Sequence, residues 1–313
     1  MKEGQNDSTS ILVIGSSNTD MVIKSNRIPL PGETILGYDF FMNPGGKGAN
    51  QAVAVARLGG KIDFIARVGS DIFGEQTLAH LKREGIHTRT IITDPVHASG
   101  VALITVDEAG ENSIVVASGA NAFLSPSDVI HHKNKITEAG IILLQLEIPL
   151  ETVLEAIKLA RAHHKKVILN PAPACSLPEE IFKELFLVTP NRLEAEMLTG
   201  IKIESLSDCE HAAQIFKAKG VHNSIITLGD RGAYVNSKTF TGHVPSVKVQ
   251  AADSTAAGDV FTAAVAVALA EDQSMEEAVQ FATKAAAIAV SRQGAQASAP
   301  YRWEMGEGGS DEW

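Results

Sequence analysis

"IILLQLEIPLETVLEAIKLARAHHKKVILNPAP" (residues 141–173) contains a complete strand–helix–strand pattern. The apolar runs at 141–147 and 166–173 have the length of buried strands, and the segment between them has apolar residues at helical spacing. Strands that are apolar on both faces and are joined by a helix are typical of a parallel sheet covered on both sides. This unit therefore predicts an α/β fold.

The same alternation continues along most of the chain. It predicts further strands at 11–15, 62–69, 185–190 and 224–232, the last with a turn, and helices at 48–60, 74–85, 125–140, 191–200, 257–272 and 275–292. We expect a three-layer α/β/α body with a mostly parallel central sheet. Its predicted segments are 11–19, 46–87 and 121–302.

Two segments, 20–45 and 88–120, have the pattern of extended chain without long helices. Within the second, residues 99–119 read as a hairpin around "DEAGEN" (107–112). We predict that the two segments form a small β-sheet lid over one end of the main sheet, where α/β proteins bind their ligands. Residues 1–10 and 303–313 are predicted to be flexible termini.

Composition excludes several classes of function. The 313 residues are 44% hydrophobic and 20% charged, with a formal net charge of -10. This acidic balance gives no basic footprint for nucleic acid, and no apolar run is long enough to cross a bilayer. The polar start is unlike a signal peptide, and the two cysteines lack metal-ligand spacing. We expect a cytoplasmic protein with neither nucleic-acid nor membrane partners.

Common phosphate-binding and hydrolase motifs are absent. "NPGGKGAN" (43–50) contains Gly-Lys, but Phe41 stands where a Walker loop needs glycine and Gly48 where it needs Ser or Thr. What remains is a set of polar residues at predicted strand ends and helix starts: Asn18, Asp20, Lys47, Asn50, Glu147, Asn191, Glu194, residues 227–232, Asp253 and Asp259. Each has a purely structural interpretation; Asn191 with Glu194, for example, has capping-box spacing. The functional hypothesis depends on their convergence at one sheet edge.

"DSTAAGDVFTAA" (253–264) is the most specific of these stretches. Its small residues at 256–258 let a ligand approach the backbone, and free N–H groups at a helix start suit an oxyanion. Asp259 beside them has the chemistry to take a proton from an attacking hydroxyl. Phosphoryl transfer needs positioning, charge stabilisation and such a base. The alternative is that Asp259 only complements the helix dipole.

Two segments, 43–59 and 253–264, resemble the signature regions of the ribokinase-like carbohydrate kinases. Further similar stretches follow in order from residue 11 to 302: "GSSNTDMV" (15–22), "IPLPGET" (28–34), "NPAPA" (170–174), "TPNRLEAEMLTG" (189–200), "ITLGDRG" (226–232) and "AAAIAVSRQGAQASAP" (285–300). The resemblance implies ATP-dependent phosphorylation of the 5-hydroxyl of D-ribose, giving ribose 5-phosphate and ADP. It also implies a homodimer formed through the lid.

The resemblance assigns roles by position, with Asp259 as the base and with Ala256, Ala257 and Gly258 as the anion hole. The implied sugar contacts, besides Asp259, are Asn18, Asp20, Gly46, Lys47, Asn50 and Glu147. The implied magnesium, phosphate and nucleotide positions are Asn191, Glu194, Thr227, Leu228, Gly229, Asp230, Arg231, Gly232, Gly258 and Thr283. A loop for an activating monovalent cation, usually K⁺, would comprise Asp253, Thr255, Ala289, Arg292, Gly294 and Ser298.

Other hypotheses stay open. The acceptor could be deoxyribose, fructose or a nucleoside such as adenosine; Phe40 and Phe41 could stack on a purine. A non-catalytic sugar-binding regulator is disfavoured, because both Asp259 and Gly258 are present. A nucleotide-binding protein without a sugar substrate would leave Asp20, Lys47 and Glu147 without a role.

Overall fold

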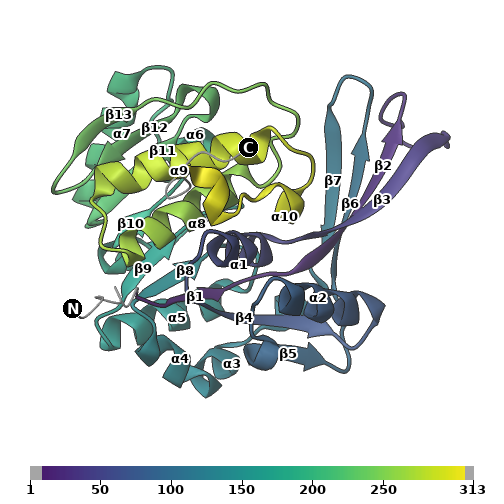
Figure 1. The fold of residues 1–313 in the computed structure, drawn as a ribbon, viewed down its shortest axis with the longest axis horizontal. Helices are drawn as coiled ribbons and strands as arrows, with labels where there is room; N and C mark the ends of the chain where they lie inside the picture. Colours follow the sequence, from purple (N-terminus) through teal and green to yellow (C-terminus); the bar gives the residue numbers. More distant parts are fainter. Residues whose placement is uncertain (1–8, 307–313) are drawn as a thin grey trace.

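The computed structural model describes residues 9–306 (Figure 1). Within that range the main sheet has nine strands in the spatial order β13-β12-β11-β10-β9-β8-β1-β4-β5. In chain order these strands are β1 (Ile11–Ile14), β4 (Ile62–Gly69), β5 (Ile91–Asp94), β8 (Ile141–Leu144), β9 (Lys166–Leu169), β10 (Leu187–Val188), β11 (Asn223–Thr227), β12 (Ala233–Asn236) and β13 (Thr241–Val244).

Neighbouring strands from β5 to β11 are all parallel, and β12 pairs antiparallel with β11 and β13. The order of the strands reverses between β1 and β8, since later strands are added outward on both sides of this pair. Such a switch point opens a crevice at the carboxyl ends of the two strands. Ser16 and Glu147, which follow β1 and β8, are hydrogen-bonded to each other there.

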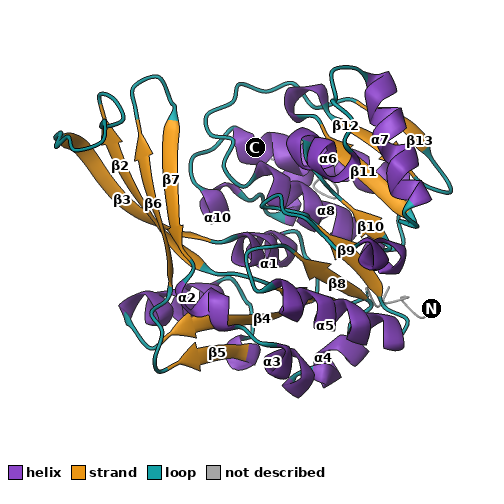
Figure 2. Ribbon diagram, turned by 180° about the vertical axis from the view of Figure 1, so that it is seen from behind, coloured by secondary structure: helices purple, strands orange, loops and turns teal. Residues whose placement is uncertain are grey.

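Helices cover both faces of the main sheet, as predicted for a three-layer fold (Figure 2). One face packs against α1 (Lys47–Arg57), α2 (Ile72–Arg83), α8 (Ala257–Ala270) and α9 (Met275–Val290). The other packs against α3 (Pro126–His131), α4 (Lys133–Glu138), α5 (Leu150–Ala162), α6 (Arg192–Thr199) and α7 (Leu206–Ala218). The short elements are α10 (Ala295–Ser298), η1 (Thr88–Thr90), η2 (Gly119–Phe123), η3 (Glu179–Glu184), η4 (Gly229–Arg231) and η5 (Arg302–Met305).

A second, four-stranded sheet extends away from the body, with the order β3-β2-β6-β7 (Figures 1 and 2). Its strands are β2 (Asn18–Ser25), β3 (Gly37–Gly45), β6 (Gly100–Val106) and β7 (Asn112–Ala117). β6 and β7 form an antiparallel hairpin, as the pattern around residues 107–112 predicts. Four short crossings join this lid to the body: residues 15–17, residue 46, residues 95–99 and residue 118.

Several boundaries differ from the prediction. The lid range 88–120 begins too early, because β5 pairs with β4 in the main sheet and the lid strand β6 starts at Gly100. The helix expected at 125–140 is two helices that meet at His132. Strands β12 and β13 were not predicted. Residues 303–306 were expected to be flexible, but η5 packs on the body with Met305 fully buried. Residues 1–8 and 307–313 lie outside the described residues.

Gly48 sits where α1 passes the connection between β1 and β2. A Cβ atom there would lie 2.5 Å from the Ser16 nitrogen and 2.6 Å from the Gly15 carbonyl carbon. Both are backbone atoms, so we expect Gly48→Ala to lower the free energy of unfolding by about 2 kcal/mol, as overpacking does. This opposes the gain of about 1 kcal/mol that alanine normally brings to a helix. Chemical denaturation measures the change, and an unchanged or raised stability would contradict the tight packing.

Candidate active site

Asp259 lies in the first turn of α8 and is only 5% exposed. Its two carboxylate oxygens accept hydrogen bonds from α1: Oδ2 from Asn50 Nδ2 and Oδ1 from Gln51 Nε2, both at 3.0 Å. Burial raises the pKa of Asp259, while the Lys47 charge and these two amide donors oppose the rise. The group is thus a buried carboxylate held in one orientation, with a proton affinity above that of an exposed aspartate.

Lys47, Glu147 and Asp20 lie around the Asp259 carboxylate. Glu147 Oε2 accepts from Ser16 Oγ at 2.6 Å and from the Lys47 backbone N–H at 2.9 Å. Asp259 raises the pKa of the Lys47 ammonium more than any other group does. Burial, together with the charges of Glu147 and Asp259, raises the pKa of Asp20 to about 6, against the opposing effect of Lys47. A half-buried cluster of acceptors with one cation can bind several hydroxyl groups.

Asn18 is fixed at the junction of lid and body. Its Oδ1 accepts from Asn121 Nδ2 at 2.8 Å, and Asn121 also bonds both the N–H and the C=O of Ser17. Asn121 belongs to η2 and was not predicted as part of the site. Gly45 and Gly46 complete the junction, since a Cβ on Gly45 would overlap the Asp20 carboxylate and Gly46 has φ of 85°.

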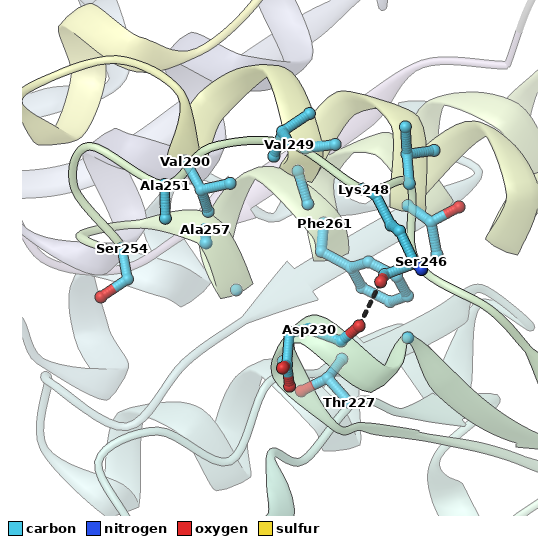
Figure 3. Close-up of a pocket in the computed structure, with 17 residues that line it drawn as sticks. Thr227, Asp230, Ser246, Lys248, Val249, Ala251, Ser254, Ala257, Phe261 and Val290 are labelled. Carbon is cyan, nitrogen blue, oxygen red and sulfur yellow. Dashed lines mark hydrogen bonds between the residues drawn. The ribbon is translucent and has the colours of Figure 1, made fainter.

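Two cavities meet at the start of α8. The smaller, of about 190 Å³, is lined by Lys47, Asn170, Ala172, Thr189, Asn191, Glu194, Thr227, Ser254, Ala256, Ala257, Gly258 and Asp259. The larger, of about 650 Å³, is shown in Figure 3 and is lined by Thr227, Gly229, Asp230, Gly232, Ser246, Val247, Lys248, Val249, Ala251, Ser254, Ala257, Gly258, Phe261, Thr283, Ala286, Ala287 and Val290. Ala257 and Gly258 line both, so the first turn of α8 lies between the cavities.

The backbone at this turn is arranged for an anion. Ala256 adopts the left-handed conformation with φ of 60°, which is rare for a residue with a side chain. Of the predicted anion-hole residues, Ala256 and Gly258 have N–H groups that donate to no protein acceptor within residues 9–306, as does Asp259, whereas the Ala257 N–H makes a long bond of 3.3 Å to the Ser254 carbonyl. Free N–H groups at a helix start carry partial positive charge and can hold phosphate oxygens.

The predicted nucleotide positions divide into two groups. Thr227, Gly229, Asp230, Gly232 and Thr283 line the larger cavity. Leu228 instead packs in the core, and the Arg231 guanidinium donates to the Glu204 carbonyl. The opposite wall of the cavity consists of residues 246–249, which were not predicted as part of the site. Figure 3 shows Lys248 and Val249 over the cavity. The Ser246 hydroxyl donates a hydrogen bond to the Asp230 carbonyl.

Asn191 and Glu194 form the capping box that their spacing predicts. Asn191 Oδ1 accepts from the Glu194 N–H at 2.9 Å, and Glu194 Oε2 accepts from the Asn191 N–H at 2.8 Å. Both residues also line the smaller cavity, and burial raises the pKa of Glu194. The structural and functional interpretations of this pair are therefore compatible.

Asp253 ties together two loops near the anion-binding turn. Its Oδ1 accepts from the Thr255 N–H at 2.8 Å and its Oδ2 from the Gly294 N–H at 2.9 Å. The other predicted cation residues lie on the same C-terminal segment, but the Arg292 side chain pairs with Glu304 and the Ser298 hydroxyl donates to the Ala295 carbonyl. Ala289 is buried in α9. Any cation here would be held mainly by backbone oxygens.

The sequence pattern of one known family matches nearly the whole chain. The pattern of the pfkB family of carbohydrate kinases covers residues 8–302. This chain belongs to that family. It is 43% identical to the ribokinase of Haemophilus influenzae over 94% of this chain and 96% of the relative. It is also 38% identical to the deoxyribokinase of Salmonella typhi over 93% of this chain and 95% of the relative.

Solved structures show the same fold. Ribokinase from Thermotoga maritima is 42% identical, with a TM-score of 0.87, and the match covers 95% of this chain and 98% of that chain. The structure of Arabidopsis thaliana ribokinase complexed with ribose and ATP is 31% identical, with a TM-score of 0.89, covering 95% and 97%. These similarities confirm the α/β fold with its lid and the resemblance stated above. In the described part of this kinase, no helix is long and apolar enough to span a bilayer.

Proposed function

We propose that this kinase transfers the γ-phosphoryl group of ATP to the 5-hydroxyl of D-ribose, giving ribose 5-phosphate and ADP. The observation that carries the proposal is the first turn of α8. There the buried Asp259 carboxylate lines one cavity, and the adjoining Gly258 separates that cavity from a second, nucleotide-sized one. The relatives named ribokinase support ribose as the acceptor.

In this proposal Asp259 accepts the proton of the sugar hydroxyl while the hydroxyl oxygen forms a bond to the γ-phosphorus. The bond from that phosphorus to the bridging oxygen breaks, and ADP leaves with the electron pair. Charge on the transferring oxygens is stabilised by the N–H groups of Gly258 and Asp259 and by the Lys47 ammonium. The buried site keeps competing water away from the phosphoryl group.

The described residues also fit the two metal ions that the family resemblance implies. Glu194 and Asn191 offer the oxygen atoms that Mg²⁺ prefers, and Mg²⁺ would neutralise phosphate charge beside them. The Asp253 loop offers mainly carbonyl oxygens, which suit K⁺. We further propose cytoplasmic location and a homodimer formed through the lid, whose outer strand β7 is exposed along its whole length.

The environment of Asn50 favours a substrate rich in hydroxyl groups, such as a sugar. The Asn50 Nδ2 is fixed by donation to Asp259, so its Oδ1 must face the other way. That oxygen is buried and has no hydrogen-bond partner among residues 9–306. A buried acceptor without a partner is costly, and a sugar hydroxyl would donate to it. Asp20 and Glu147 provide further acceptors nearby.

Sugar binding should weaken in acid through Asp20, whose pKa is raised to about 6. The carboxylate accepts hydroxyl donors best when ionised, so affinity is full above pH 7 and falls as the pH drops through 6. If ribose binds the ionised form, the Kd should rise about tenfold between pH 7.5 and pH 5. Calorimetry without nucleotide measures it, and Asp20→Asn should lose most of the dependence. A flat wild-type profile would exclude Asp20 as an ionised sugar ligand.

One assay tests the whole proposal. ADP release is measured with ATP and Mg²⁺ against D-ribose, 2-deoxyribose, fructose, adenosine and no acceptor, each with and without K⁺. We expect the highest kcat/KM with ribose, together with activation by K⁺. A preference for 2-deoxyribose would overturn ribose as the substrate and assign this kinase the activity for which its deoxyribokinase relatives are named. The absence of any acceptor-dependent turnover would overturn the kinase proposal.

A further inference from the structure

A chain of buried amide side chains supports Asp259 from behind. Gln145, Asn170 and Thr189 each follow directly after a strand, β8, β9 and β10, and these three strands are neighbours. Gln51, fully buried on α1, contacts both this row and Asp259. None of these four residues was among the candidates from the sequence, and none has a role in the proton transfer proposed above.

The hydrogen bonds run in one direction along the chain. Gln145 Nε2 donates to Gln51 Oε1 at 2.5 Å, and Asn170 Nδ2 donates to the Thr189 carbonyl at 3.1 Å. Gln51 Nε2 donates both to Asp259 Oδ1 at 3.0 Å and to Asn170 Oδ1 at 3.2 Å. The Thr189 carbonyl fixes the orientation of Asn170, and Gln145 fixes that of Gln51.

A reversed Gln51 amide would be strongly disfavoured. Its oxygen would then face the Asp259 carboxylate and the Asn170 carbonyl oxygen, and its N–H₂ group would face the Gln145 N–H₂ group. The network therefore specifies one side-chain orientation, as satisfied buried polar networks do. A donor is always presented to the same carboxylate oxygen.

Gln145 has a cost in stability. Its Oε1 is buried without a partner among the described residues, which is unfavourable for folding. The side chain fits only because residue 15 is glycine, since a Cβ there would lie 2.0 Å from Gln145 Oε1. An apolar side chain at 145 would avoid the unpaired oxygen. The arrangement indicates that Gln145 serves its contact with Gln51.

We propose that Gln51 is a positioning residue for Asp259, and that Gln145 and Asn170 act through it by holding its amide in the one orientation that donates to Oδ1. The inference rests on Asp259 acting as the base in the proposed function. Asn50 holds the other carboxylate oxygen, so the two amides of α1 together fix the plane of the carboxylate.

The network also affects protonation. Donation from Gln51 lowers the pKa of Asp259, against the effect of burial. The charged groups facing Asp259 are Lys47 on α1, Glu147 after β8, Asp20 on β2 and Glu194 on α6. Removing the Gln51 donor while these charges stay should raise the pKa of Asp259. The acid limb of the kcat profile should then move to higher pH.

The test is a double-mutant cycle with Gln51→Met and Gln145→Met, measured with the best acceptor from the assay above. Gln51→Met should lower kcat about tenfold to a hundredfold with little change in the KM for the sugar, because a misplaced base slows only the chemical step. Gln145→Met should cause a smaller loss and add nothing in the Gln51→Met background. The acid limb should shift in each variant.

Asn223→Leu is the matched control, because it removes a buried amide that donates to the Phe186 carbonyl at the start of β11, at the opposite end of its strand from the site. It should lower stability but leave kcat and its pH profile unchanged. An unchanged kcat in Gln51→Met, or additive effects of the two substitutions, would overturn the positioning role while the kinase proposal stands. No sugar-dependent turnover by the wild-type protein would overturn both.

Discussion

Asp259→Asn is expected to lower kcat by about 10³-fold, because an amide cannot take the proton that the sugar hydroxyl releases. Sugar binding should persist, since the substitution leaves Asp20, Lys47 and Glu147 in place. The kcat is measured from ADP release at saturating sugar and ATP, and the Kd for the sugar by calorimetry.

The fold should tolerate this change. Asparagine keeps one oxygen for the Gln51 donor, and its new N–H₂ group can donate to Asn50 if the Asn50 amide turns to present its unpaired Oδ1. The denaturation midpoint should therefore stay close to that of the wild-type protein. A kcat within about tenfold of the wild-type value would leave Asp259 as a helix-start residue and not a base.

Gly258→Ala is expected to lower kcat by about 10²-fold, the loss typical of one missing anion-hole donor. Gly258 lines both cavities, and its N–H has no protein acceptor among residues 9–306. A methyl group on this turn would occupy space at the junction of the two cavities and push the phosphoryl group away from the N–H. Steady-state kinetics on both substrates measure the loss.

Stability separates this effect from misfolding. A Cβ on Gly258 would meet no heavy atom within 4 Å, so Gly258→Ala should fold as well as the wild-type protein. Gly48→Ala, in which the new Cβ would meet backbone atoms, should by contrast be less stable than the wild-type protein. Full activity in Gly258→Ala would exclude the first turn of α8 as the point of phosphoryl transfer.

The sequence was most informative where burial imposes a regular pattern. Strands such as β1 and β8 are apolar along their whole length because helices cover both faces of the sheet, and this pattern predicted the three layers. The convergence of Lys47, Glu147 and Asp259 followed from a general rule, that the sites of α/β proteins form where strands end and helices begin.

Features that depend on long-range contacts were missed. Strands β12 and β13, the last two at one end of the sheet, are short, and only their antiparallel pairing beside β11 distinguishes them from loops. The tail "MGEGGSDEW" (305–313) is mostly polar in sequence, but its first residue, Met305, is buried in the core. Gln145 and Asn170 left a readable signal, a polar residue directly after an apolar strand. Their partner Gln51 could be identified only from the packing of α1 on the sheet.

The four crossings between body and lid have a mechanical consequence. Any change in the angle of the lid must be absorbed within residues 15–17, 46, 95–99 and 118. Ser16 in the first crossing donates to Glu147, and Ser99 in the third donates twice to Asp71 at the start of α2. Glu147 belongs to the site that is proposed to bind the sugar, so a rotation of the lid would be transmitted to that site through Ser16 in the first crossing.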